Sequence, residues 1–234
     1  MSATIYGLGV GPGDPELITL KAERLLRRVP VIAYPATETG ESLAREIAAP
    51  HIGDGVVEVP IRIPIYAPSF PDGALYDEAA RTIEALLGDG RDVAVLCEGD
   101  PFFYGSFMYL FARLSERHPV EVVPGVSSLT ACAAALGTPL AARNDVLSVL
   151  PATLPADVLR ARLEAADAAA LIKVGRHLDK VRGILAELGL LDRARYIERA
   201  TMANQQAKPL AEVSADDAPY FSMILVHRRG EAWR

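Results

Sequence analysis

Three glycine-rich segments carry the residues that could bind a ligand. They are Gly7-Leu8-Gly9-Val10-Gly11-Pro12-Gly13-Asp14-Pro15, Gly99-Asp100-Pro101 and Pro124-Gly125-Val126-Ser127-Ser128. Glycine allows a ligand to approach the backbone closely. A carboxylate accepts hydrogen bonds from hydroxyl or ammonium groups, and serines at a helix start suit an anionic group. Each segment follows an apolar run, so the sequence predicts three ligand-contacting loops at the carboxyl ends of strands.

The first segment lacks the fingerprint of a dinucleotide site. If G-x-G-x-x-G starts at Gly7, Pro12 occupies the third glycine position, and if it starts at Gly9, Asp14 does. No Gly-Lys-Ser/Thr follows, so the segment is not a P-loop either. Pro12 has no backbone N–H to donate to a phosphate, and Asp14 would repel one. Both features argue against a phosphate-binding loop. The structural alternative is a tight turn in which Asp14 caps the next helix.

The other two segments also have structural alternatives. Asp100-Pro101 is common turn chemistry, and the aromatic residues 102–104 that follow could belong to the core. Ser127 and Ser128 could simply cap a helix. The order of all three segments, each after an apolar strand, favours a binding site over three unrelated turns.

Composition excludes several classes of protein. The chain has 234 residues, is 50% hydrophobic and carries a net charge of −6, which indicates a globular fold rather than a disordered chain. The excess of acidic over basic residues, without a cluster of Lys and Arg, argues against a nucleic-acid binder. No apolar run approaches the roughly 20 residues of a membrane span.

The sequence also bears on location and metal binding. No signal peptide is visible, and Cys97 and Cys132, which we expect to be buried free thiols, favour a cytoplasmic location. No metal site is expected, because the histidines have no ligand spacing: His51, His118, His177 and His227.

The positions of these segments depend on alternating strands and helices. The apolar patterns predict strands at residues 4–10, 31–34, 56–65, 92–97, 120–123, 146–150, 169–174, 195–198 and 221–227, with a further candidate at Val213. They predict helices at residues 16–28, 41–49, 75–87, 106–117, 127–136, 155–165 and 177–188. Strand–helix alternation implies parallel pairing and an α/β fold, with a mixed sheet expected towards the tail.

A break at residues 137–143 predicts two domains, 1–137 and 138–234. The first would carry the glycine-rich loops.

The order of the motifs resembles the tetrapyrrole (corrin/porphyrin) methylase family. The motifs read GxGxGPGDPxLxTLKA, VAVLxEGDPxFYGS and VxPGVSS, and the stretches 198–201, 205–206 and 219–225 extend the resemblance over nearly the whole chain. Within the family, residues 33–36, 41–44 and 219–222 are most similar to members that methylate carbon 20 of precorrin-2, or of its cobalt form, to give precorrin-3A in cobalamin biosynthesis.

The resemblance implies two α/β domains with S-adenosylmethionine (SAM) in a cleft between them, a fold distinct from the Rossmann type, and a homodimer. The SAM-binding positions that it implies are Pro12, Gly99, Asp100, Phe103, Ser127, Ser128, Lys173, Ala200, Thr201, Met202 and Ser222.

The implied chemistry is attack of a tetrapyrrole carbon on the methyl group of the SAM sulfonium, which requires no protein nucleophile. Alignment of the two reactants can supply about 7–11 kcal/mol of the barrier. Tyr104, Asp100 and Glu98 are candidate proton acceptors, beside water and the macrocycle. The substrate carries carboxylates, which cationic side chains would bind. The candidates are Arg62, Arg113, Arg143 and Arg176. Each of them could instead be a solvated surface residue.

Two other functions stay open at this point. One is a different tetrapyrrole methylation, on uroporphyrinogen III or on a later precorrin. The other is a non-catalytic nucleotide-binding module that uses the same glycine loops.

Overall fold

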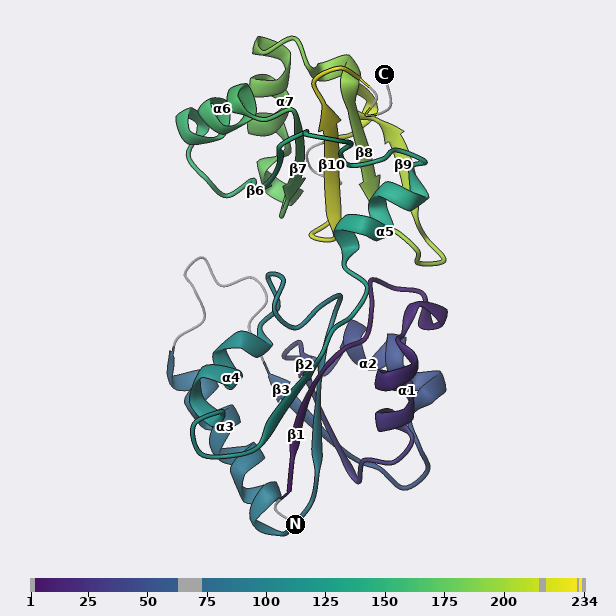
Figure 1. The fold of residues 1–234 in the computed structure, drawn as a ribbon, viewed down its shortest axis with the longest axis vertical. Coiled ribbons are helices and arrows are strands. Elements are labelled where there is room, and N and C mark those ends of the chain that lie inside the picture. Colours follow the sequence, from purple (N-terminus) through teal and green to yellow (C-terminus); the bar gives the residue numbers. More distant parts are fainter. Residues whose placement is uncertain (1–2, 63–72, 215–217, 231, 233–234) are drawn as a thin grey trace. The chain divides into compact units, whose positions relative to one another are not determined.

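The computed structural model describes residues 3–62, 73–214, 218–230 and 232 (Figure 1). The chain divides into two compact units, residues 1–127 and 128–234. Each unit has one five-stranded sheet with helices packed on it, so the predicted α/β class is confirmed. In the described part of the chain, no helix has the length and apolar character needed to cross a bilayer.

The first unit contains a parallel sheet with the strand order β3-β2-β4-β1-β5. Its strands are β1 (Ile5–Gly9), β2 (Val31–Ala36), β3 (Val57–Arg62), β4 (Val93–Cys97) and β5 (Val120–Val123). Its helices are α1 (Leu20–Leu26), α2 (Leu43–Ala48), α3 (Gly73–Gly88) and α4 (Phe107–Leu114), with 3₁₀ turns η1 (Pro15–Leu17) and η2 (Ala49–His51).

Helices cover both faces of this sheet (Figure 1). Alternate strand residues such as Leu8 and Leu96 pack with α1 and α2. Their neighbours, such as Ile5 and Val95, pack with α3 and α4. This arrangement explains why the strands of the first unit are apolar on successive residues, as parallel strands buried on both faces are.

One predicted helix of the first unit is divided in two. We expected a continuous helix over residues 16–28, but η1 ends at Leu17 and α1 begins at Leu20. Ile18 has an extended backbone, and the Thr19 hydroxyl accepts a hydrogen bond from the backbone N–H of Ala22. Because that hydroxyl satisfies a free N–H at the helix start, the chain begins a new helix there.

The second unit contains a mixed sheet with the strand order β6-β7-β10-β8-β9. Its strands are β6 (Leu147–Pro151), β7 (Ala168–Ile172), β8 (Ala194–Glu198), β9 (Gln206–Pro209) and β10 (Ser222–His227). Its helices are α5 (Ser128–Ala135), α6 (Ala156–Ala165) and α7 (Leu178–Glu187), with 3₁₀ turns η3 (Gly175–His177), η4 (Leu191–Arg193) and η5 (Leu210–Glu212). Among the described pairs of this sheet, only β6 and β7 are parallel. β10 is antiparallel to both β7 and β8, and β9 is antiparallel to β8.

The strand predicted near Val213 is wrong. The structure has a strand earlier, β9, and Val213 follows η5 with its side chain in the core. All four residues of β9 are exposed, so they lack the apolar alternation on which the prediction of strands depends. The strand predicted over residues 56–65 corresponds to β3, and residues 63–65 lie outside the described part.

The units divide ten residues before the boundary that we placed at 137. Helix α5 packs on the second sheet, where Cys132 lies in a core cluster with Ala170, Ile197 and Met223. The glycine and proline at 137–139 therefore end a helix of the second unit.

Candidate functional site

The three glycine-rich loops follow three adjacent strands of the first sheet. β4, β1 and β5 are neighbours in the strand order, and they run in the same direction. The loops after them, at residues 10–14, 98–106 and 124–127, therefore start from the same edge of the sheet. Ligands of open α/β sheets bind outside the carboxyl ends of the strands.

Glycine is required where these loops meet. A Cβ atom on Gly9 would lie 2.5 Å from the backbone nitrogen of Gly125 and 2.7 Å from the carbonyl oxygen of Gly99. A Cβ atom on Gly125 would overlap that same oxygen. Gly11 and Gly99 also form a bridge, in which the Gly99 N–H donates to the Gly11 carbonyl over 2.7 Å. The glycines therefore let three backbone segments pack against each other.

Asp100 connects two of the loops. One carboxylate oxygen accepts a hydrogen bond from the Phe102 N–H at 2.9 Å, and the other accepts from the Gly125 N–H at 3.0 Å. The first contact is the turn chemistry considered from the sequence, and the second extends it to another strand end. The position of Asp100 is thus explained by the loops that it joins.

Glu98 precedes this turn. Burial raises the pKa of its carboxyl above the ordinary value, while hydrogen bonds from its own N–H and from the Ala44 N–H act in the other direction. A raised carboxyl pKa is the direction that suits a general base near neutral pH.

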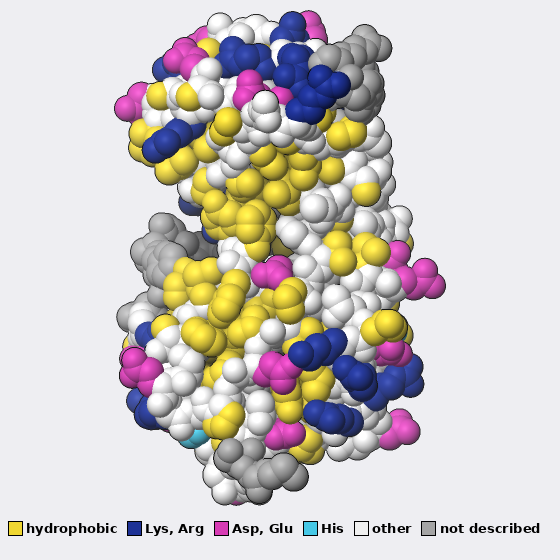
Figure 2. All heavy atoms as spheres, in the orientation of Figure 1, with side chains coloured by type: hydrophobic (Ala, Val, Ile, Leu, Met, Phe, Trp, Pro, Cys, Tyr) yellow, Lys and Arg dark blue, Asp and Glu magenta, His cyan; other side chains and the backbone are white. Residues whose placement is uncertain are grey.

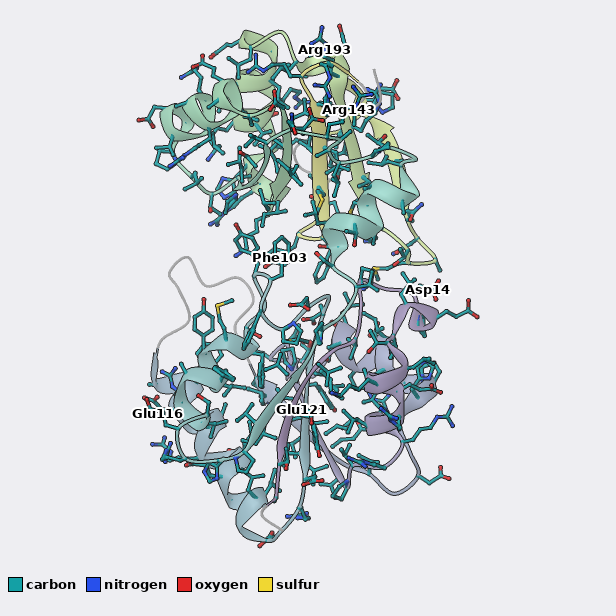
Figure 3. All side chains as sticks on the ribbon, viewed as in Figure 1. Asp14, Phe103, Glu116, Glu121, Arg143 and Arg193 are labelled. Atoms are coloured by element: carbon teal, nitrogen blue, oxygen red, sulfur yellow. The ribbon has the colours of Figure 1, made fainter. Side chains whose placement is uncertain are left out.

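The aromatic residues after Asp100 are partly core and partly surface. Phe102 is 49% exposed and Tyr104 46% exposed, whereas Phe103 is half-buried (Figure 3). The Phe102 ring packs edge-on against Phe111 of α4, with ring centres 5.1 Å apart. Tyr104 has a φ of 57°, a left-handed backbone that is uncommon for a non-glycine residue. Such positions cluster at binding sites.

The other predicted residues on the loops after β1 and β5 have simpler roles. Asp14 accepts from the Glu16 N–H at 2.9 Å and so caps η1, as the structural alternative proposed. Pro12 is half-buried between β1 and this cap. Ser127 and Ser128 lie where α5 begins.

Five predicted positions of the second unit gather at one end of its sheet. Lys173 follows β7, the stretch Ala200–Met202 follows β8 by one residue, and Ser222 begins the antiparallel strand β10. Ser222 pairs with Glu198, and Met223 with Ile172, which brings these strand ends together. Left-handed φ angles occur here at three described residues other than glycine: Lys173 (56°), Arg199 (49°) and Thr201 (69°). This conformation is most unusual for a β-branched threonine.

A buried polar cluster supports this end of the sheet. Tyr196 donates to Oε2 of Glu198 over 2.7 Å, and the Arg199 guanidinium donates to Oε1 over 3.0 Å. Burial, and then the Glu198 carboxylate, raise the pKa of Tyr196, so the phenol stays protonated. Glu198 and Arg199 belong to a motif that carries the family resemblance, but we predicted a role for neither from the sequence. Their contacts with Tyr196 and with each other depend on which face of the strand is buried.

The four arginines predicted to bind substrate lie in different surroundings. Arg113 donates to Asp77, to the Tyr109 carbonyl and to the Gly73 carbonyl, and it lies over the Tyr76 ring. Arg62 donates to the Glu38 carbonyl. Both contribute to the structure of the first unit.

The other two arginines lie at opposite ends of the second sheet. Arg176 is exposed in η3, next to Gly175, whose N–H donates to the Ser222 hydroxyl over 3.4 Å. Arg143 is in the loop before β6 (Figure 3). In this loop, the Asp145 carboxylate accepts from the Ala142 N–H and forms a hydrogen bond with the ring of His227, the last residue of β10. Of these two, Arg176 is thus the one near the predicted SAM-binding positions of that unit.

The family model described as Tetrapyrrole (Corrin/Porphyrin) Methylases matches residues 4–214. The cobalamin biosynthesis protein CobIJ of Mycobacterium tuberculosis is 45% identical to this chain over 231 residues, which is 95% of this chain and 46% of CobIJ. The chain therefore spans about half the length of that relative. The precorrin-2 C(20)-methyltransferase of Sinorhizobium sp. is 44% identical over 230 residues, covering 95% of this chain and 94% of the relative.

The fold is similar to that of a solved methyltransferase. The uroporphyrin-III C-methyl transferase of Thermus thermophilus, solved in complex with S-adenyl homocysteine, superimposes with a TM-score of 0.69 and 25% identity, over 96% of this chain and 97% of the other. These similarities confirm the family that the motifs indicated and the fold class expected from it. The chain belongs to the tetrapyrrole (corrin/porphyrin) methylase family.

Proposed function

We propose that this protein is a SAM-dependent C-methyltransferase that methylates carbon 20 of precorrin-2 or of cobalt-precorrin-2. The observation that carries the proposal is the similarity to a precorrin-2 C(20)-methyltransferase over nearly the full length of both chains. The three loops after β4, β1 and β5 support it, because they follow the carboxyl ends of neighbouring parallel strands, where ligands of α/β sheets bind.

The proposed SAM-binding residues of the first unit are on these loops. Gly99, Asp100 and Phe103 follow β4, Pro12 follows β1 and Ser127 follows β5. The glycines support this role because they let the three loops pack together at one edge of the sheet. The proposed positions that follow in the second unit are Ser128, Lys173, Ala200, Thr201, Met202 and Ser222. Bound SAM supplies an electrophilic methyl group.

The residues of this chain have three tasks in such a reaction: to bind both reactants, to align them and to accept a proton. Alignment of the two reactants can lower the activation barrier by about 7–11 kcal/mol. The candidates to accept the proton from the methylated carbon are Glu98, Asp100 and Tyr104. The raised pKa of Glu98 supports its candidacy. The two backbone hydrogen bonds to Asp100 favour a positioning role for that residue.

The direct test is methylation by the purified chain. The protein is incubated with SAM and, in separate reactions, with precorrin-2, cobalt-precorrin-2 and uroporphyrinogen III. Mass spectrometry then counts added methyl groups, and NMR of the product from ¹³C-methyl-labelled SAM locates them. We expect one methyl group at carbon 20 of one of the first two substrates. Methylation of uroporphyrinogen III alone would contradict the proposed substrate.

A non-catalytic nucleotide-binding module is the second candidate. It predicts that NAD or ATP, and not S-adenosylhomocysteine (SAH), raises the thermal unfolding temperature. The proposed methyltransferase predicts the reverse, because a ligand at 100-fold excess over its Kd stabilises the folded state by about 2.7 kcal/mol.

We also propose that the protein acts in the cytoplasm as a homodimer. Two buried free cysteines support the location. Hydrophobic side chains that gather on one face of each unit support self-association (Figure 2). Light scattering after gel filtration distinguishes a dimer from a 25.1 kDa monomer.

A further inference from the structure

We propose that Arg199 binds a carboxylate at the carboxyl end of β8. The inference rests on the proposed function, in which both reactants carry carboxylates: the methionyl group of SAM and the periphery of the tetrapyrrole. Arg199 directly follows β8, and its N–H donates to the Phe221 carbonyl over 2.8 Å. It therefore lies at the sheet end that also carries Lys173 and Ser222.

The guanidinium of Arg199 is held in place by a buried carboxylate. Glu198 is only 5% exposed, and one of its oxygens accepts from Arg199 Nη1 over 3.0 Å. Its other oxygen accepts from Tyr196, which is fully buried. Ser222, whose backbone pairs with Glu198 in the sheet, donates its hydroxyl proton to the Pro219 carbonyl. Because each member of this cluster is itself fixed, the orientation of Arg199 is set before any ligand binds.

Most of the hydrogen-bonding capacity of Arg199 is unused among the described residues. A guanidinium has five N–H donors, and within the described residues the side chain of Arg199 donates to Glu198 alone. Arg113 differs, because three of its nitrogens donate to Asp77 and to two backbone carbonyls. The Arg199 side chain is 33% exposed, so a ligand can reach it.

The backbone at this position also indicates a binding role. Arg199 and Thr201 both have left-handed φ angles, 49° and 69°. The Thr201 N–H is fixed by a 2.7 Å hydrogen bond to the Gln205 side chain. Non-glycine residues keep this conformation only where their surroundings impose it. A planar guanidinium with free donors matches a carboxylate in two parallel hydrogen bonds, and Lys173 at the adjoining strand end adds a second cation.

Substitution of Arg199 tests this assignment. Arg199→Lys keeps a charge beside buried Glu198 but loses the planar fork, and Arg199→Gln removes the charge. If the glutamine variant fails to fold because Glu198 is left unpaired, the lysine variant decides. Arg195→Lys is the matched control, because Arg195 is on the same strand and donates only to backbone carbonyls among the described contacts.

Two binding measurements distinguish the sources of the carboxylate. The first is the Kd of SAH and of 5′-methylthioadenosine, which lacks the carboxylate, by calorimetry. The second is the KM for the tetrapyrrole at saturating SAM. We expect one of two results for Arg199→Lys, each a loss of about tenfold to a hundredfold. Weaker SAH binding with unchanged methylthioadenosine binding identifies SAM as the ligand, and a raised KM with unchanged SAH binding identifies the tetrapyrrole.

The inference is overturned if both constants stay within about twofold of the wild-type values, or if SAH and methylthioadenosine lose affinity equally. Its failure is separate from that of the proposed function. The wild-type chain tests the function by binding SAH and methylating precorrin-2, whatever the variants do.

Discussion

At the scale of single residues, Asp100 makes the turn contact that was the structural alternative to ligand binding, and it adds a contact to a second loop. Its carboxylate caps the turn that follows β4, and it also accepts from Gly125 beyond β5. A residue that joins two loops of a binding site affects ligand affinity through their positions, whether or not it contacts the ligand.

Asp100→Ala tests this role. The substitution leaves two backbone N–H groups without their acceptor, so we expect the free energy of unfolding to fall by about 1–3 kcal/mol. SAH affinity should fall in the same variant, because the loops after β4 and β5 lose their connection. Urea unfolding and calorimetry measure the two effects. Asp89→Ala is the control, since Asp89 is exposed and pairs only with Arg91 among the described contacts, and it should change stability by less than about 0.5 kcal/mol. Unchanged stability of Asp100→Ala would contradict the structural role.

The arginines show where residue type is insufficient. Guanidinium groups suit a substrate with carboxylates, but the sequence does not tell which of them already bind other groups of the protein. Arg113 is bound by groups of its own unit, whereas Arg199, not among the predicted candidates, keeps donors available in the part of the chain that the structure describes. The difference depends on contacts between residues that are far apart in the chain, as between Arg113 and Asp77.

At the scale of elements, the three loops were predictable and their adjacency was not. Each loop follows an apolar run and is marked by glycine, and the structure has a strand at each of these places. That β1 lies between β4 and β5 is decided by how the sheet is wound. Exposed β9 and the interruption of the first helix at Thr19 also escaped the patterns, because neither changes the apolar periodicity.

Gly125→Ala tests the packing of the loops. The added Cβ atom would overlap the Gly99 carbonyl oxygen, so the loops must separate. We expect a loss of about 1–3 kcal/mol in the free energy of unfolding and at least tenfold weaker SAH binding. Gly183→Ala is the control: it is an exposed glycine of α7 with open space at the Cβ position, and the change should stabilise the protein by about 0.5–1 kcal/mol. Unchanged SAH binding by Gly125→Ala would show that the loops tolerate the separation.

At the scale of the whole molecule, the two units have separate hydrophobic cores. The clusters of the first unit include residues up to Val123, and those of the second begin with α5. We predicted the boundary at 137 from glycine and proline, which mark chain breaks. The division at 127 follows from the apolar side of α5, which is buried against the second sheet.

Two fragments test this division. The fragment 128–234 retains α5, and we expect it to unfold cooperatively in a thermal melt followed by circular dichroism. The fragment 138–234 lacks α5 and uncovers apolar residues such as Ile197 and Met223. It should melt at a lower temperature and bind a hydrophobic dye. Equal melting temperatures for the two fragments would contradict the assignment of α5 to the second unit.

The sequence by itself determined the class of fold, most of its strands and helices, and the family. These depend on local signals: apolar periodicity within about ten residues and short motifs at strand ends. Only the tertiary structure decided which loops are neighbours, where the units divide, and which charged groups remain available for a ligand. Those properties arise from the winding of each sheet and from burial, and both depend on contacts between distant parts of the chain, such as that of Asp100 with Gly125.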